Sequence, residues 1–404
     1  MRVLQISHRH HIAGGSDAVF FATRRLLREA GHEVIPFCMA DPQNRPSHWE
    51  RFFPAGADTA SARLHDTIRY FYNSQARRNL NALLDHLGHV DVAHLHIYHG
   101  KQTPAILSVL RNRAIPVVHT LHEYKLACPV YTLERDGRPC LNCVRGSVLN
   151  VLRHRCKDGS LLRSGVMLAE MASARLLGDV RLVDRFICVS DFQRQIMRRA
   201  GLPAERLVTL HNFVEPGIAE PGHDGYLLYF GRIERLKGIE TLVRAATRAG
   251  TRLLIAGAGS WSDRLRSLTD ATDHIDYLGF RQGDALARLV ARARAVVVPS
   301  QWYENCPMSV LEAKAAGRPV IGADIGGIPE LVRDGIDGFL FEAGNVASLE
   351  AAFRRLAAAD HETLSRNALA DVKARFSPAR HLQDLMRIYE DTCPRTTGAH
   401  LQPA

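Results

Sequence analysis

The chain has 404 residues, of which 46% are hydrophobic and 23% charged, a composition typical of a globular protein and not of a disordered one. This length is enough for two or three domains. No stretch approaches the roughly 18 apolar residues of a transmembrane helix, and the N-terminal MRVLQISHRHH has a strand-like apolar run in place of a signal peptide's hydrophobic region. We therefore expect a cytoplasmic protein.

The formal net charge of +10 is concentrated in the first half of the chain. Residues 1–212 contain 29 Lys and Arg against 18 Asp and Glu, whereas residues 213–404 contain 23 against 24. A basic half is suited to an anionic partner such as a membrane surface, a lipid-linked phosphate or nucleic acid. A basic surface that only confers solubility explains the asymmetry equally well.

The N-terminal residues predict a βαβ unit. A strand over residues 2–7, a loop ending in Gly14 and Gly15, a helix and a strand over 33–40 follow one another. The two glycines would let the backbone pass close to a ligand, although adjacent glycines are also typical of a plain turn. The three spaced glycines of a dinucleotide-binding loop are absent.

A second βαβ unit is predicted by the strands over 91–97 and 116–122, preceded by a long basic amphipathic helix over 60–87. His122 ends the later strand, so its imidazole would lie at the edge of the sheet where α/β proteins bind ligands. From position alone, a structural and a functional histidine are equally good interpretations.

Four of the eight cysteines, Cys128, Cys140, Cys143 and Cys156, fall within one 29-residue stretch. In a reducing cytoplasm such a cluster indicates metal ligands more readily than disulfides. Only one pair has the tight CxxC spacing, so a tetrahedral structural zinc site requires that the loop fold both outer thiolates inward. Free thiols or a regulatory disulfide are the alternatives. Four cysteine ligands would leave no open position for catalysis.

Residues 214–224 hold two prolines and two glycines without an apolar period, which indicates a linker. A second α/β unit then begins with a strand, a glycine turn and a helix. Arg232 and Lys237 bracket that turn, and a guanidinium and an ammonium beside helix N–H groups are suited to a diphosphate. Later strands over 251–257, 274–280, 294–300 and 318–324 predict a second parallel sheet.

Two carboxylates lie eight positions apart in the stretch 298–330. Glu304 follows a predicted strand, and Glu312 lies in a helix that Pro307 opens. A loop acid followed by free backbone N–H groups around Cys306, Met308 and Ser309 is suited to holding a phosphorylated ligand. By spacing alone, a solvated loop acid and a helix surface acid explain the pair better.

The fold class expected from these elements is α/β, with two Rossmann-like, doubly wound parallel-sheet domains. The expected boundaries are an N-terminal domain over 1–213 with a cysteine-rich insertion over 126–158, the linker 214–224 and a C-terminal domain over 225–377. A final helix over 378–393 and a disordered tail over 394–404 complete the chain.

Taken together, these motifs resemble one known family. The glycine pair at 14–15, His122 in LHEY, FGRIERLKG, and Glu304 and Glu312 within WYENCPMSVLEAKAAGRPVI occur in one order. This combination resembles a family 4 glycosyltransferase with the GT-B fold, over essentially the whole chain and most specifically over residues 228–345. The cysteine-rich insertion resembles one found in some bacterial members.

The resemblance implies two domains that face a central cleft, with the sugar-nucleotide bound mainly to the second, the acceptor to the first, and the last helix crossing back to the N-terminal domain. It also implies retention of anomeric configuration and transfer without a divalent metal. Catalytic positions would be His122 and Glu304, both at the transferring sugar. Glu312 would bind the ribose, and the implied donor-binding set is Gly14, Gly15, Arg232, Lys237, Asn305, Cys306, Pro307, Met308, Ser309 and Glu312.

The expected partners are a UDP- or GDP-linked hexose, a glycan or lipid-linked acceptor in cell-surface polysaccharide synthesis, and an anionic membrane surface at the inner face of the cell membrane. Rival hypotheses are a GT-B epimerase or phosphorylase, or a basic zinc-containing protein that binds nucleic acid. Against the last, the basic residues are dispersed and not interleaved with aromatic residues, so we expect no nucleic-acid partner.

Overall fold

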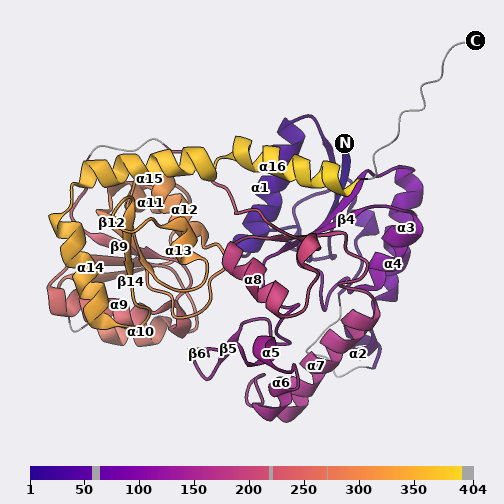
Figure 1. Ribbon diagram of the computed structural model, residues 1–404, viewed down its shortest axis with the longest axis horizontal. Helices are drawn as coiled ribbons and strands as arrows, with labels where there is room; N and C mark the ends of the chain where they lie inside the picture. The colour runs from indigo at the N-terminus through magenta and orange to yellow at the C-terminus, as the bar shows by residue number, and fades with distance from the viewer. Residues whose placement is uncertain (57–63, 218–221, 271, 394–404) are drawn as a thin grey trace, which may run out of the picture.

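The computed structural model describes residues 1–56, 64–217, 222–270 and 272–393. They form two α/β lobes, each built on a six-stranded parallel sheet (Figure 1). The predicted fold class of two doubly wound parallel sheets is confirmed. The predicted tail and part of the predicted linker lie outside the described residues.

The first sheet has the strand order β2-β1-β3-β4-β7-β8. The sequence predicted strands over 2–7, 33–40, 91–97 and 116–122, and each of the four observed strands lies inside the corresponding range. Their apolar side chains are buried on both faces because helices cover both sides of a parallel sheet. The strands are β1 (Arg2–Ile6), β2 (Glu33–Phe37), β3 (Val92–Leu95), β4 (Val117–Leu121), β7 (Arg185–Cys188) and β8 (Leu207–Thr209). The helices packed on this lobe include α1 (Gly15–Glu29), α3 (Ser74–Leu87), α4 (Ala105–Asn112) and α8 (Asp191–Arg199).

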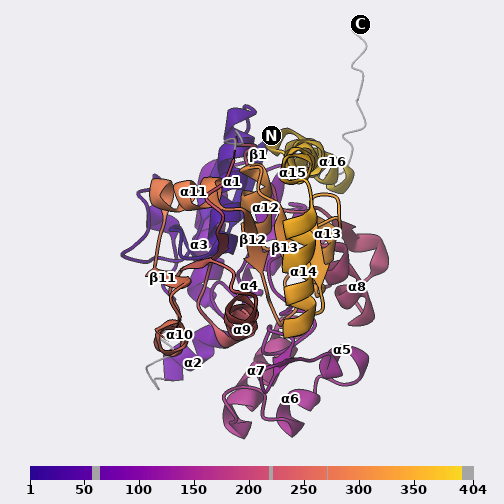
Figure 2. The same ribbon diagram turned by 90° about the vertical axis from the view of Figure 1, so that its left-hand side faces the viewer.

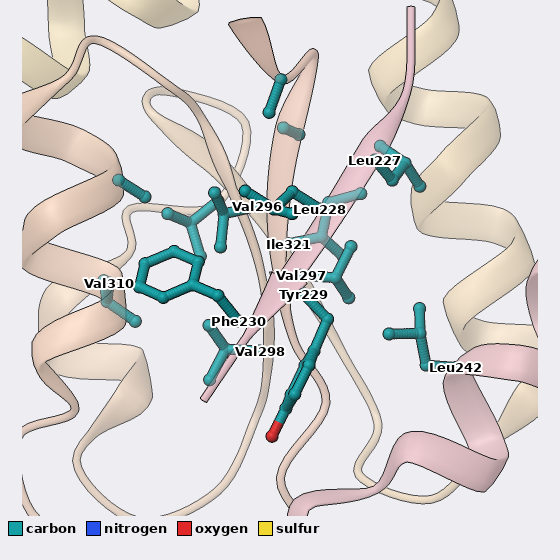
Figure 3. Close-up of a cluster of buried hydrophobic side chains, with 14 of the residues drawn as sticks. Leu227, Leu228, Tyr229, Phe230, Leu242, Val296, Val297, Val298, Val310 and Ile321 are labelled. Atoms are coloured by element: carbon teal, nitrogen blue, oxygen red, sulfur yellow. The ribbon is translucent and has the colours of Figure 1, made fainter. Parts of the chain in front are cut away.

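The second sheet has the order β11-β10-β9-β12-β13-β14. Its core is hydrophobic, and Figure 3 shows side chains of β9, β12 and β13 packed against one another and against Leu242 and Val310. The strands are β9 (Leu227–Phe230), β10 (Leu253–Ala256), β11 (Ile275–Gly279), β12 (Ala295–Val298), β13 (Val320–Ala323) and β14 (Gly338–Phe341). The helices are α9 (Ile239–Ala249), α10 (Ser262–Thr269), α11 (Gly283–Arg292), α12 (Met308–Ala315), α13 (Ile328–Leu331), α14 (Val346–Ala358) and α15 (His361–Arg375).

Each strand order reverses once, between β1 and β3 in the first sheet and between β9 and β12 in the second. In open α/β sheets the loops at the carboxyl ends of the strands diverge at such a point and leave room for a ligand. The loops that carry Arg232, Lys237 and Glu304 follow β9 and β12, so they meet at this point of the second sheet.

An insertion between β4 and β7 projects below the first sheet (Figures 1 and 2). It contains a short hairpin of β5 (Glu134–Arg135) and β6 (Arg138–Pro139), two single-turn helices, α5 (Asn142–Arg145) and α6 (Asn150–Arg153), and the long helix α7 (Leu161–Leu176). Its elements are short because the stretch is rich in turn residues and has few apolar runs.

The last helix, α16 (Pro378–Thr392), runs from the second lobe back across the first (Figure 1). Pro378 occupies its first turn and Ser377 caps it, which is the expected chemistry of a helix start. Leu385 and Tyr389 are fully buried against strand residues of the first sheet. The two lobes are therefore connected twice, by the 214–224 segment and by α16.

The prediction of a single long helix over 60–87 is wrong. The described part is two helices, α2 (Leu64–Phe71) and α3, separated at Asn73. The Asn73 side chain accepts a hydrogen bond from the Ala76 N–H and donates to the Lys101 carbonyl, so it caps α3 and fixes the bend. Ile68 of α2 is 57% exposed, and residues 60–63 lie outside the described chain.

Candidate active site

Glu304 lies in the loop after β12 and is almost fully buried. Its Oε1 accepts hydrogen bonds from the ammonium of Lys237, at 2.6 Å, and from the Ser300 hydroxyl, at 2.7 Å. Burial alone would raise the pKa of this carboxyl, but the charge of Lys237 and the hydrogen bonds outweigh it and lower the pKa. The site therefore contains a buried, ionised carboxylate paired with a lysine.

Glycines fix the backbone around this pair. The N–H of Gly327 donates to the Glu304 carbonyl at 2.7 Å, and a Cβ at position 327 would lie 1.9 Å from the Asn305 carbonyl oxygen. Gly238, which follows Lys237, has a positive φ of 72°, and a Cβ there would lie 1.8 Å from the Pro299 carbonyl oxygen. Both loops pack backbone against backbone, which only glycine permits.

Arg232 and Lys237 lie near the ring of Trp302. The guanidinium carbon of Arg232 is 5.8 Å from the ring centroid and the Lys237 ammonium 4.9 Å, both within the range of a cation–π interaction. Arg232 is exposed and pairs with the Glu234 carboxylate at 3.0 Å. Its guanidinium can therefore exchange an intraloop partner for an anionic ligand.

Helix α12 begins at Met308, with Pro307 as its N-cap and not as its first helical residue. No side chain caps the helix, so its first N–H groups remain available for an anion. Ser309 lies in the first turn. Cys306 is buried, its thiol pKa is raised to about 12 by burial, and its carbonyl accepts from Asn212. Only the backbone of Cys306 is thus suited to a ligand.

Glu312 projects from α12, and its carboxylate has no hydrogen bond or ion pair with any other described residue. Part of its surface is open to solvent, while the surrounding protein desolvates the carboxyl and raises its pKa. Glu312 and Glu304 are therefore in different environments: one is free to accept hydrogen bonds from a ligand, and the other is already paired.

Asn305 joins the two halves of the site. Its side-chain amide donates to the carbonyl of His122 at 3.0 Å, across 183 residues of chain. His122 follows β4 at the carboxyl edge of the first sheet, as predicted, and is half-buried. The structure therefore brings His122 to the loop that carries Glu304.

The sequence interpretation missed His96, which orients the His122 ring. The Gln5 amide nitrogen lies 3.2 Å from both the Phe20 carbonyl and His96 Nε2, so this amide N–H₂ group donates to both acceptors. His96 must then carry its proton on Nδ1 and donate it to His122 Nε2, at 2.8 Å. His122 is left with its proton on Nδ1. The alternation HLH on β3 was a signal for this residue, because His94 and His96 share one face of the strand.

The two N-terminal glycines lie at the start of α1. Gly14 is the N-cap, with extended backbone angles, and a Cβ at either Gly14 or Gly15 would meet no heavy atom within 4 Å. The described residues therefore leave open space beside these glycines. Their approach to a ligand stays a prediction.

Glu330, which no sequence motif indicated, also connects the lobes. Its carboxylate accepts from the first two N–H groups of α8, those of Asp191 and Phe192, at 2.7 and 2.6 Å. It also contacts His211 Nε2 at 2.9 Å. A carboxylate at the N-terminus of a helix is favoured by the helix dipole, so this contact holds the second lobe against the first.

The four clustered cysteines gather in the insertion as free thiols. Burial raises the pKa of Cys143 to about 12, and the neighbouring thiols of Cys128, Cys156 and Cys140 contribute to the rise. Among the described residues, no group of three or more His, Cys, Asp or Glu side chains is arranged to hold a metal ion. Structural zinc at these thiols stays a prediction, which metal analysis of the purified protein tests.

We expect His122 to remain neutral down to about pH 4, with its proton on Nδ1, because burial lowers its pKa to about 4 and His96 donates to Nε2. Between pH 6.5 and 4 the unfolded chain binds a proton that folded His122 does not, so this residue makes stability fall as pH falls. Nitrogen-15 NMR of the histidine rings measures both the tautomer and the titration.

The control is His96→Leu, in which His122 loses its fixed partner and both tautomers become populated. Wild-type protein with His122 protonated on Nε2, or titrating near pH 6.5, would contradict the hydrogen-bond chain.

Comparison with known proteins accounts for this arrangement. The family model "Glycosyltransferase Family 4" matches residues 13–217, and the model "Glycosyl transferases group 1" matches residues 214–370. The D-inositol 3-phosphate glycosyltransferase of Mycolicibacterium smegmatis is 28% identical over 263 residues, 57% of this chain and 58% of that protein. The D-inositol 3-phosphate glycosyltransferase 1 of Catenulispora acidiphila is 28% identical over 389 residues, 85% of this chain and 82% of that protein. The chain thus spans less than two thirds of the first relative.

Among solved structures, Anabaena HepE in complex with UDP and glucose superposes with a TM-score of 0.65 and 16% identity, covering 97% of this chain and 100% of that chain. A likeness at this identity shows a shared fold, and the predicted GT-B fold is confirmed. Because the family model spans just over half of the sequence and its companion model continues to residue 370, the chain belongs to Glycosyltransferase Family 4.

Proposed function

We propose that this protein is a retaining glycosyltransferase that moves a hexose from a UDP- or GDP-linked donor to a hydroxyl of a glycan or lipid-linked acceptor in cell-surface polysaccharide synthesis. The observation that carries the proposal is the Lys237–Glu304 pair, which lies where the strand order reverses, beside an uncapped helix start and an unpaired Glu312. The lysine and the helix N–H groups would suit the diphosphate of a nucleotide-sugar, Glu312 its ribose and Glu304 its sugar.

In this proposal the donor diphosphate lies against Arg232, Lys237 and the first N–H groups of α12. Glycosyl transfer leaves negative charge on the departing phosphate, and fixed cations and N–H dipoles stabilise that charge most when they are already oriented. These groups would do so without a divalent metal. Lys237 is oriented beforehand by Glu304, at 2.6 Å.

Glu312 would accept hydrogen bonds from the ribose hydroxyls, since its carboxylate has no partner among the described residues. Glu304 would lie beside the transferring sugar, and His122 would offer its Nδ1–H to a sugar oxygen from the other lobe. We do not assign the two glutamates the acid and nucleophile roles of a glycosidase, because the role proposed for Glu312 is recognition of the ribose. The leaving phosphate takes the acceptor's proton as the acceptor attacks from the same face of the sugar, which gives retention.

We expect one nucleotide-sugar in a UDP and GDP panel to raise the melting temperature, because a ligand that binds only the folded state stabilises it. Incubation of that donor with a glycan acceptor should give an α-linked product from an α-linked donor, seen by proton NMR. A β-linked product would contradict retention. Interconversion of free nucleotide-sugars would favour an epimerase, and phosphate-dependent cleavage of glycan a phosphorylase.

We expect Glu304→Gln and Glu312→Gln to affect different kinetic constants. Glu304→Gln should lower kcat by about 10²-fold or more with little change in donor affinity, because it removes a charge close to the reacting sugar. Glu312→Gln should mainly raise the donor KM, because its contact is made equally in the ground and transition states. Steady-state kinetics measures both. Glu342→Gln, an exposed acid on the same lobe, is the control, and equal effects of the two variants on kcat would contradict the assigned roles.

We also propose that the basic first lobe docks on an anionic membrane. What supports this is the surface of residues 148–166, where Leu149, Leu161 and Leu162 are 59%, 55% and 79% exposed. The exposed cations Arg153 and Arg163 lie among them. Apolar side chains interspersed with arginine are typical of surfaces that insert shallowly into anionic bilayers. None of the described helices is long and apolar enough to cross a membrane.

Co-sedimentation with vesicles should therefore increase with the fraction of anionic lipid and decrease with salt. The double variant Leu161→Gln, Leu162→Gln should bind these vesicles more weakly, because it removes the apolar contact. Phe280→Gln, which removes an equally exposed apolar side chain from the second lobe, is the control. Binding that does not depend on anionic lipid would contradict the proposal.

A further inference from the structure

A cavity lies between the insertion and the loop that carries Glu304. Its volume is about 450 Å³, and its lining includes Arg135, Arg138 and Arg145 of the insertion and Tyr303 of the second lobe. Tyr303 directly precedes Glu304, and its ring packs on Phe192 of α8 with centroids 5.0 Å apart. Consecutive residues of one loop therefore line the cavity, through Tyr303, and the proposed transfer site, through Glu304.

The tip of the β5–β6 hairpin also contacts the loop that follows β9. Gly137 at this tip has a positive φ of 77°, and a Cβ there would lie 2.5 Å from the Nη2 atom of Arg235. Arg235 belongs to the same loop as Arg232 and Lys237. The hairpin therefore places the cavity beside the proposed diphosphate site.

The lining of the cavity is strongly cationic. It contains three arginines and a single carboxylate, that of Asp136, which lies 3.5 Å from Arg135. Arg138 and Arg145 are exposed, and neither guanidinium makes a hydrogen bond or ion pair with another described residue. The amide of Asn142 and the phenol of Tyr303 line the same space. Guanidinium groups around a polar cavity match the planar oxygens of carboxylates and phosphates.

We propose that this cavity binds an anionic group of the acceptor, a phosphate ester or a sugar carboxylate, and so orients the attacking hydroxyl toward the donor sugar. The proposal rests on the proposed glycosyltransferase function. The donor's own diphosphate has a separate set of partners in Arg232, Lys237 and the N-terminus of α12. The cavity is built mainly by the first lobe, so it lies across from the donor site with Tyr303 between them.

Ligand-observed NMR tests the assignment with three probes: glucose 6-phosphate, glucuronate and neutral glucose. Each is titrated in the presence of saturating UDP or GDP, whichever binds, so that the diphosphate site is filled. We compare the wild type with the double variant Arg138→Gln, Arg145→Gln and with both single variants. Arg111→Gln, which removes an exposed arginine of the first lobe outside the cavity, is the matched control.

We expect at least one anionic probe to bind the wild type about tenfold or more tighter than glucose, because hydrogen bonds between charged groups exceed neutral ones. The double variant should lose this preference, whereas Arg111→Gln should keep it. The relative affinities of glucose 6-phosphate and glucuronate identify phosphate or carboxylate as the preferred anion.

The acceptor assignment is overturned if the double variant binds the anionic probes as the wild type does, or if the probes bind no better than glucose. It is also overturned if the double variant loses nucleotide affinity to the same degree, since the arginines would then belong to the donor site. Failure of the glycosyltransferase proposal is distinguishable, because it appears as the absence of nucleotide-sugar binding in the wild type.

Discussion

The buried pair of Lys237 and Glu304 is the interaction on which the rest of the site depends. It joins the loops after β9 and β12 at the point where the strand order reverses, and both side chains lie largely out of water. A buried ion pair is stable only when hydrogen bonds compensate for the lost hydration, and Ser300 supplies one of them. The pair fixes a cation and a carboxylate in place before any ligand arrives, and charges oriented beforehand are the basis of electrostatic catalysis.

A site shared by two lobes also requires that the lobes keep their relative position. Three contacts far apart in sequence do this: Asn305 with the His122 carbonyl, Glu330 with the start of α8, and Tyr389 of α16 with His94 at 2.6 Å. The first two join a polar side chain of one lobe to a polar group of the other, as is common between domains. The third is fully buried and anchors α16 on the first sheet.

The sequence was sufficient for those features that depend on neighbours along the chain. Strands over 2–7 and 116–122 were predictable from their apolar runs, and the loop position of Glu304 followed from the strand before it. The ion pair of Glu304 with Lys237 was not predictable, because it joins residues 67 positions apart. The tautomer of His122 was not predictable either, because it depends on Gln5 and His96, which are distant in the chain. The helix break at Asn73 was missed because the amphipathic period continues through it. The Asn73 side chain nevertheless caps α3 and so ends the preceding helix.

The arginine cavity shows a different limit. The clustered cysteines predicted a metal site in the insertion, but no local pattern predicted the arginine cavity. The arginines are spread over 135–145 and form one surface only because the hairpin turns at Gly137. Three consecutive residues of the β12 loop then face three different partners: Tyr303 lines this cavity, Glu304 binds Lys237, and Asn305 binds His122. These residues are consecutive, so a displacement that carries the whole loop would change all three contacts at once. The arginine cavity, the Lys237–Glu304 pair and the His122 carbonyl of the opposite lobe are thus contacted within two peptide bonds of one another.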